Sequence, residues 1–185
     1  MHIIYNESYL LTNEINKTIE KNILKFKKIS IIYYNPEELN KDKYLNNCKI
    51  LSYFCKKNRL EFYVSDNLNL CMKFKCKGIF LTNPKKNKNY TYLKKNFKII
   101  GRAHNQLEYS ILNKKGCSTI MLSPLFYNNK YSLNQILNIV RFNLITNLWK
   151  TKICALGGIN IKNINRIKML NNKISISFKS LINDL

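Results

Sequence analysis

The chain has 185 residues, 45% of them hydrophobic, and it carries 32 Lys and Arg against 10 Asp and Glu, a formal net charge of +22. This length and apolar content predict a single domain over residues 1–185 and exclude an intrinsically disordered chain. Because the sequence lacks a run of 18 apolar residues and a signal-peptide pattern, we expect a cytoplasmic protein without a membrane span.

Short β-branched and aromatic runs alternate with longer amphipathic stretches, a pattern typical of βα units and a parallel sheet. The expected strands are His2–Tyr5, Ile29–Tyr34, Leu60–Val64, Gly78–Leu81, Phe97–Ile100, Ser118–Leu122, Ile153–Leu156 and Ile174–Phe178. The expected helices are Leu11–Phe26, Tyr44–Cys55, Leu68–Phe74, Gln106–Lys115, Leu133–Trp149 and Ile161–Leu170. The Lys- and Asn-rich segment Lys85–Asn96 has room for a short helix at most.

Eight strands joined by right-handed crossovers can close on themselves. The sequence therefore predicts the α/β class and a compact (β/α)8 TIM-type barrel. The chain is shorter than the roughly 200–250 residues usual for such barrels. The segments after the fourth and the eighth expected strands are short, which accounts for the difference in length. An open doubly wound sheet is the alternative architecture.

The large positive charge raises the alternative of a basic protein that binds nucleic acid or a protein partner. The lysines are spread along the whole chain, however, and lack the Arg and aromatic interleaving of single-strand binders. We therefore expect no nucleic-acid binding. The six cysteines form no Cys-x-x-Cys pair and only two histidines accompany them, so buried reduced thiols fit better than disulfides or zinc.

The pair Gly157-Gly158 follows the seventh expected strand and is the strongest single feature of the sequence. Glycines there let backbone N–H groups approach an anion, and a helix beginning near Ile161 would add its positive N-terminal dipole. Lys179 and Ser180, after the eighth strand, would add a charge and a hydroxyl. We predict a phosphate site at this end of the barrel. A tight turn that merely requires glycine is the alternative.

Three segments in this order resemble the thiamine-phosphate synthase/TenI family: Ile100–Asn105, Thr119–Phe126 and Ala155–Asn160. The resemblance extends from Leu60 onward. It implies a barrel that binds a phosphorylated thiazole. In the synthases this compound is joined to hydroxymethyl-pyrimidine diphosphate with release of pyrophosphate, and magnesium helps to stabilise the departing diphosphate.

The resemblance leaves other activities open. TenI-like members isomerise the thiazole tautomer, with a histidine moving the proton. A non-catalytic or regulatory member of the family is a further alternative. The oligomeric state, including a homo-oligomer, is also left open by the sequence.

Residues that match the family carry expected roles. Gly157, Gly158, Lys179, Ser180 and Ser123 are expected to bind substrate, Asp66 to bind Mg²⁺, and His104 and Lys130 to act in catalysis. Tyr33 offers a ring that could stack on a heteroaromatic substrate. Each has a plainer alternative: a helix cap for Asp66 and His104, a solvated side chain for Lys130, and core packing for Tyr33.

Three positions depart from the family pattern. The second strand normally ends in a Gln-x-Arg-x-Lys run, whereas Ile31–Asn35 contains no cation. The second magnesium carboxylate should follow the fourth strand, where the chain has Thr82-Asn83-Pro84. These two departures predict an eroded diphosphate site. The third is Arg102, which stands in place of the usual serine if His104 matches the family histidine.

Overall fold

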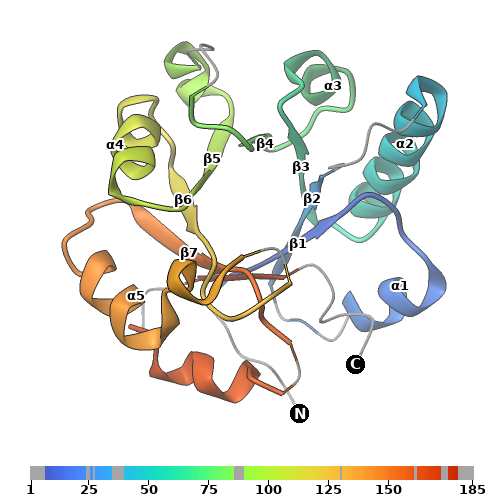
Figure 1. The fold of residues 1–185 in the computed structure, drawn as a ribbon. Helices are drawn as coiled ribbons and strands as arrows, with labels where there is room; N and C mark the ends of the chain where they lie inside the picture. The colour runs from blue at the N-terminus through green and yellow to red at the C-terminus, as the bar shows by residue number, and fades with distance from the viewer. Residues whose placement is uncertain are drawn as a thin grey trace.

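The computed structural model describes residues 7–23, 26, 28–34, 40–85, 90–129, 131–160, 162–171 and 175–178. Eight parallel strands pair in chain order and close into a barrel, with β8 beside β1 (Figure 1). They are β1 Ser8–Thr12, β2 Ile29–Tyr33, β3 Glu61–Ser65, β4 Gly78–Leu81, β5 Lys98–Ala103, β6 Thr119–Leu122, β7 Lys152–Leu156 and β8 Ser175–Phe178. The predicted (β/α)8 barrel is confirmed, and the open sheet is excluded.

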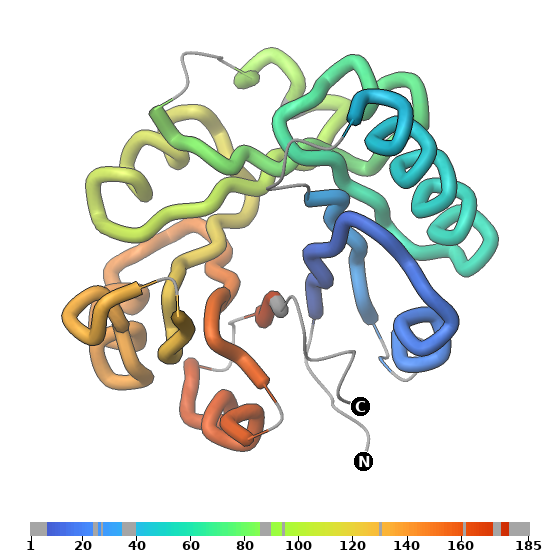
Figure 2. The backbone as a smooth tube through the Cα atoms, turned by 45° about the vertical axis from the view of Figure 1, so that its right-hand side comes forward, coloured from blue at the N-terminus to red at the C-terminus, as the bar shows by residue number. Residues whose placement is uncertain are grey.

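The helices surround the ring of strands (Figure 2). The α-helices are α1 Lys17–Ile23, α2 Lys41–Lys57, α3 Leu68–Lys73, α4 Gln106–Lys114 and α5 Asn138–Thr146. Short 3-10 helices cover Thr91–Lys95, Leu133–Gln135 and Ile164–Met169. Within the described part of the chain, no helix has the length and apolar character needed to cross a membrane.

The first strand differs from the prediction. His2–Tyr5 lies outside the described residues, and β1 contains Leu11, which we expected to begin a helix. Tyr9 and Leu11 pack in the barrel interior while Leu10 packs against the outer layer, an alternation that only a strand permits. The following helix starts later, where the Asn16 side chain accepts a hydrogen bond from the Ile19 N–H at 2.8 Å.

Two later helices are shorter than predicted. The stretch expected as one helix over Leu133–Trp149 is broken at Ile136, whose backbone is extended. The break occurs because the N–H groups of Leu137 and Asn138 donate to the Pro124 and Leu125 carbonyls. The predicted helix Ile161–Leu170 is only the 3-10 helix Ile164–Met169.

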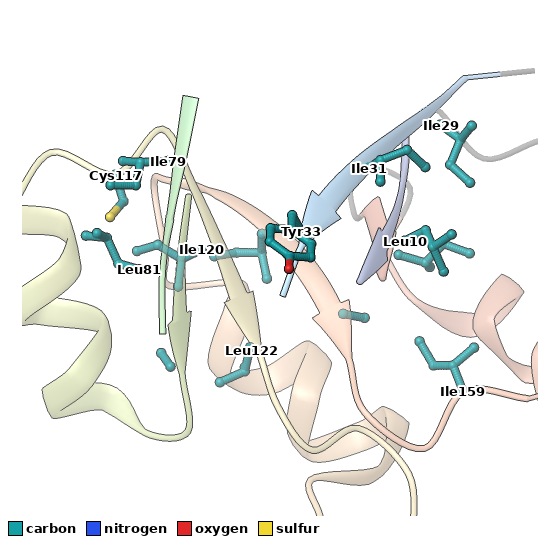
Figure 3. Close-up of a cluster of buried hydrophobic side chains, with 14 of the residues drawn as sticks. Leu10, Ile29, Ile31, Tyr33, Ile79, Leu81, Cys117, Ile120, Leu122 and Ile159 are labelled. Carbon is teal, nitrogen blue, oxygen red and sulfur yellow. The ribbon is translucent and has the colours of Figure 1, made fainter. Parts of the chain in front are cut away.

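The buried side chains form two layers. One cluster fills the barrel interior and consists of Tyr9, Leu11, Ile32, Tyr63, Phe80, Ile100, Met121, Cys154 and Leu156. The larger cluster lies between the strands and the helices, and part of it is drawn in Figure 3. All six cysteines are buried, and none of them is in a disulfide. Because apolar side chains pack on both faces of the strands, the strands appear in the sequence as continuous apolar runs.

The carboxylate of Glu7 links residues at the amino-terminal ends of several strands. Glu7, directly before β1, accepts hydrogen bonds from Lys28 at 3.0 Å and from Lys152 at 2.5 Å. The Tyr9 hydroxyl donates to the same carboxylate at 3.1 Å. Burial raises the pKa of Glu7, but the hydrogen bonds from Lys152 and Lys28 outweigh it and lower the pKa from 4.5 to about 2.

We predict that Glu7→Gln destabilises the barrel at neutral pH and that this difference from the wild type vanishes in acid. A carboxylate whose pKa falls on folding stabilises the protein above the unfolded pKa of 4.5, and this contribution is lost as the pH falls toward 2. Denaturant unfolding of both proteins across this pH range measures the difference. The exposed Glu14, as Glu14→Gln, is the control. A Glu7→Gln deficit that stays constant down to pH 2 would contradict the prediction.

Candidate functional site

A pocket of about 540 Å³ opens at the carboxyl-terminal ends of the strands. Ser123, Gly157 and Gly158, three of the residues predicted from the sequence to bind substrate, line it together. The other lining residues come from strand ends and from the loops after β6 and β7, and are Leu11, Tyr34, Arg102, Tyr127, Asn128, Asn129, Tyr131, Leu156, Ile159 and Asn160. The predicted location of the site at this end of the barrel therefore coincides with a real cavity.

The loop after β6 and the loop after β7 are joined by backbone hydrogen bonds. The N–H of Leu125 donates to the Leu156 carbonyl at 2.9 Å, and that of Phe126 to the Gly157 carbonyl at 3.0 Å. These bonds bring the Ser123 side chain, which is 3% exposed, against the glycine pair. Main-chain hydrogen bonds thus hold these two loops of the pocket rim together.

The glycine pair is required by the turn itself. Gly157 and Gly158 have φ values of +94° and +70°, in the left-handed region. A Cβ on Gly158 would lie 2.4 Å from the Phe126 carbonyl oxygen, and one on Gly157 would lie 3.0 Å from Ser123 Oγ. Among the described residues, none accepts a hydrogen bond from the N–H groups of Gly157, Gly158 or Ile159. The turn therefore requires both glycines, as the alternative stated. The three N–H groups could also donate to an anion.

The expected helix dipole is absent from this site. We predicted an α-helix beginning near Ile161, but the 3-10 helix starts at Ile164 and has six residues. The Asn160 and Asn163 side chains hold the preceding turn, since the Asn160 N–H donates to Asn163 Oδ1 at 2.9 Å and Asn163 Nδ2 donates to the Gly158 carbonyl at 2.7 Å. Lys130, Lys179 and Ser180, also predicted for the site, lie outside the described residues.

Arg102 is the one charged side chain among the described residues that line the pocket. It belongs to β5, although the sequence suggested a loop there. Its guanidinium donates at 3.4 Å to the Tyr34 hydroxyl and at 3.4 Å to the Thr82 carbonyl, and it lies 5.9 Å from the centroid of the Tyr34 ring. Nε is buried without a partner among the described residues. Arg102 thus brings a cation, with only neutral partners, to the end of β2.

Tyr33 does not line the pocket, but its neighbour Tyr34 does. Tyr33 is fully buried in the outer core layer, where Figure 3 draws it with Leu10 and Ile31. Its hydroxyl donates to the Tyr44 carbonyl at 2.9 Å. Burial raises its pKa above the usual value. The packing alternative therefore describes Tyr33, and Tyr34 takes the position expected for it.

His104 reaches the pocket through another side chain. Its Nδ1 lies 2.9 Å from Glu108 Oε2, and its Nε2 lies 3.1 Å from the hydroxyl of Tyr131, which lines the pocket. The backbone N–H of His104 also donates to Glu108 at 2.8 Å. The cap of α4 is Asn105, which accepts from the Glu108 N–H at 2.9 Å. The sequence predicted a catalytic role for His104, which stays a prediction, and indicated neither of its two side-chain partners, Glu108 and Tyr131.

Asp66 has a structural role that the sequence did not indicate. The cap of α3 is Asn67, so Asp66 is not a helix cap. Asp66 Oδ1 accepts from the Thr82 N–H at 3.2 Å, and its other oxygen accepts from the Thr82 hydroxyl. The described residues contain no group of three or more His, Cys, Asp or Glu side chains able to hold a metal. Binding of Mg²⁺ by Asp66 stays a prediction.

The family model for thiamine monophosphate synthase matches residues 1–176. The chain belongs to this family. The fold and the family together support a function of the thiamine-biosynthesis kind. A search of curated proteins finds no match.

Solved structures share the barrel at low sequence identity. Thiamine phosphate pyrophosphorylase from Pyrococcus furiosus has a TM-score of 0.72 at 16% identity, with 94% of this chain and 85% of that chain covered. 3-Hexulose-6-phosphate synthase from Salmonella typhimurium has a TM-score of 0.63 at 10% identity, covering 97% and 91%. 2-Keto-3-deoxy-6-phospho-gluconate aldolase from Zymomonas mobilis has 0.63 at 11%, covering 93% and 81%. At these identities the likeness shows the fold.

We predict that Asp66→Asn and Thr82→Val each lower the free energy of unfolding by about 1–3 kcal/mol. Thr82→Val removes the hydroxyl donor, and Asp66→Asn replaces its charged acceptor with a neutral amide, so each change weakens the same charge-assisted hydrogen bond. The double variant should cost less than the sum of the two, because both changes remove one interaction. Denaturant unfolding of the four proteins measures this coupling. Strictly additive losses would show that the Asp66–Thr82 contact contributes nothing.

Proposed function

We propose that the rim pocket binds a phosphorylated thiazole and that the protein joins it to hydroxymethyl-pyrimidine diphosphate, releasing pyrophosphate. The observation that carries this proposal is the convergence of Ser123, Gly157 and Gly158 on one pocket. These residues come from two of the three segments that resemble the family. Membership of the thiamine monophosphate synthase family supports the same assignment.

The phosphate of the thiazole is proposed to bind at the glycine turn. The N–H groups of Gly157, Gly158 and Ile159 are available as donors in the described part of the chain, and the Ser123 hydroxyl lies beside them. Backbone donors held in a fixed turn bind an anion without a rearrangement. Lys179 and Ser180 remain proposed additional contacts. The three similar barrels described above are all named for phosphorylated compounds.

The diphosphate is proposed to bind in the part of the pocket lined by Arg102 and Tyr34. Arg102 supplies one cation there, whereas the family pattern has both an arginine and a lysine on the second strand. A guanidinium can grip phosphate oxygens through two parallel hydrogen bonds. We therefore propose that this subsite carries less positive charge than the family pattern and that its cation comes from β5 instead of β2. The subsite would then bind the diphosphate weakly.

Negative charge develops on the diphosphate as its bond to the pyrimidine methylene carbon breaks. A donor placed at such an anion contributes on the order of 3 kcal/mol to the rate. Mg²⁺ would neutralise part of the charge when bound, and Asp66 is its proposed protein ligand, with diphosphate oxygens and water completing the shell. Lys130 remains a proposed catalytic residue, and Tyr34 replaces Tyr33 as the ring proposed to stack on a substrate.

A second candidate is isomerisation of the thiazole phosphate between tautomers. One observation favours it: His104 contacts a tyrosine of the pocket and a carboxylate at the same time. This activity requires the phosphate site and a group that moves a proton, and makes no use of a diphosphate site. The reduced charge near β2 is compatible with it.

We predict that thiazole phosphate binds at least about tenfold more tightly than the pyrimidine diphosphate. The reason is that the glycine turn retains its donors, while the diphosphate subsite has lost charge-assisted contacts worth about 1.4 kcal/mol or more, a factor of ten. Isothermal titration calorimetry with both compounds and with pyrophosphate, with and without Mg²⁺, measures the preference. Tighter, magnesium-dependent binding of the diphosphate with rapid product formation would instead indicate an intact synthase.

We predict that Arg102→Met weakens binding of pyrophosphate by roughly tenfold or more, because it removes the cation of the pocket. Arg141→Met, on the exposed surface of α5, changes the net charge equally and serves as the control. Arg102→Lys should restore less than half of the lost binding free energy, since a lysine cannot donate in a fork. Equal affinities of Arg102→Met and Arg141→Met would show that only the general positive field acts on the ligand.

A further inference from the structure

We infer that Tyr131 is the acid–base group of the pocket and that His104 and Glu108 act behind it as positioning residues. This inference deepens the second candidate function, the movement of a proton on a phosphorylated thiazole. It assigns a role to two residues, Tyr131 and Glu108, that the sequence analysis did not single out. The three side chains form one continuous chain of contacts from α4 to the pocket.

Glu108 fixes the tautomer of His104. A carboxylate can only accept hydrogen bonds, and Oε2 of Glu108 accepts at 2.8 Å from the His104 backbone N–H and at 2.9 Å from Nδ1. The proton of the neutral imidazole is therefore on Nδ1. Side-chain exposures of 28% for His104 and 17% for Glu108 place this pair partly out of water, where such a hydrogen bond is stronger.

The remaining ring nitrogen faces Tyr131. With Nδ1 protonated, Nε2 carries a lone pair, so it accepts the Tyr131 hydroxyl proton over 3.1 Å. The two rings lie 5.8 Å apart at 42°. Because its proton is directed at His104, the Tyr131 oxygen presents lone pairs in other directions, and Tyr131 is a lining residue of the pocket. The arrangement corresponds to an activated hydroxyl with a base oriented by a third group.

A helix cap explains only part of this arrangement. The bonds between Glu108 and His104 join residues at the start of α4 and would steady that helix end. The contact between His104 and Tyr131 joins residues 27 positions apart, in the loop after β5 and the loop after β6. A cap needs no second partner on Nε2, and that partner is the one that reaches the pocket.

The proposed step conserves protons. The Tyr131 oxygen takes a proton from the thiazole ligand while the hydroxyl proton passes to His104 Nε2, giving an imidazolium that Glu108 stabilises. The reverse transfer returns a proton to a different atom of the ligand. The ligand is isomerised, no bond other than those to hydrogen is broken, and Tyr131, His104 and Glu108 end as they began. Tyr131 is thus the catalytic residue, and its oxygen is the atom that touches the ligand.

The first test follows hydrogen exchange of thiazole phosphate in D2O by NMR, with calorimetry on the same proteins. Tyr131→Phe should lower the exchange rate by about a hundredfold or more, while affinity stays within about threefold. Tyr127→Phe, which removes another hydroxyl from this pocket, should have an effect at least about ten times smaller. His104→Gln should slow exchange as much as Tyr131→Phe, and the double variant no more than either.

Failure of binding and failure of the relay give different results. A protein that does not bind thiazole phosphate overturns the proposed function and this step with it. A protein that binds the compound and does not exchange it, or exchanges it equally in Tyr131→Phe, overturns the relay alone. The chain has two histidines, so ring ¹⁵N signals are readily assigned. His104 should be protonated on Nδ1, with an Nε2 signal that shifts in Tyr131→Phe; protonation on Nε2 also overturns the relay.

Discussion

The pairing of β8 with β1 is the constraint on which the rest of this structure depends. Ser8 lies opposite Ile176 and Tyr9 opposite Ser177, which closes a parallel sheet into a ring. Closure brings the carboxyl ends of all the strands to one rim. Leu11 from β1, Tyr34 from the end of β2, Arg102, Ser123 and the glycine turn can then line a single pocket. An open sheet would leave these groups along an edge.

The sequence predicted the barrel because strands buried on both faces appear as apolar runs at regular intervals. It could not distinguish Tyr33 from Tyr34, because inward and outward positions alternate and a shift of one residue exchanges them. For the same reason the sequence did not predict that the Arg102 side chain, within β5, faces the pocket. Contacts between loops, such as His104 with Tyr131, depend on how distant segments meet and leave no local pattern.

The distribution of charge matters more here than its sum. A chain with a net charge of +22 has, among its described pocket residues, one cation. Exposed lysines act through water and are screened within about 8 Å at physiological salt, so they do not replace a guanidinium inside the pocket. At the other end of the barrel, lysines instead surround Glu7 and contribute to the fold. The ion pairs of Glu7 and the proposed ligand site of Arg102 thus use separate sets of charged residues.

The rim of the pocket is joined by main-chain hydrogen bonds from Leu125 and Phe126 to the loop after β7. Bonds of this kind are indifferent to which side chains the residues carry, apart from the glycines that the turn requires. Sequence drift can therefore replace the reactive groups one at a time while the cavity keeps its outline. A TM-score of 0.72 at 16% identity to a thiamine phosphate pyrophosphorylase shows the same barrel built from a largely different sequence. The outline of this rim therefore tolerates substitutions that would change the chemistry of the pocket.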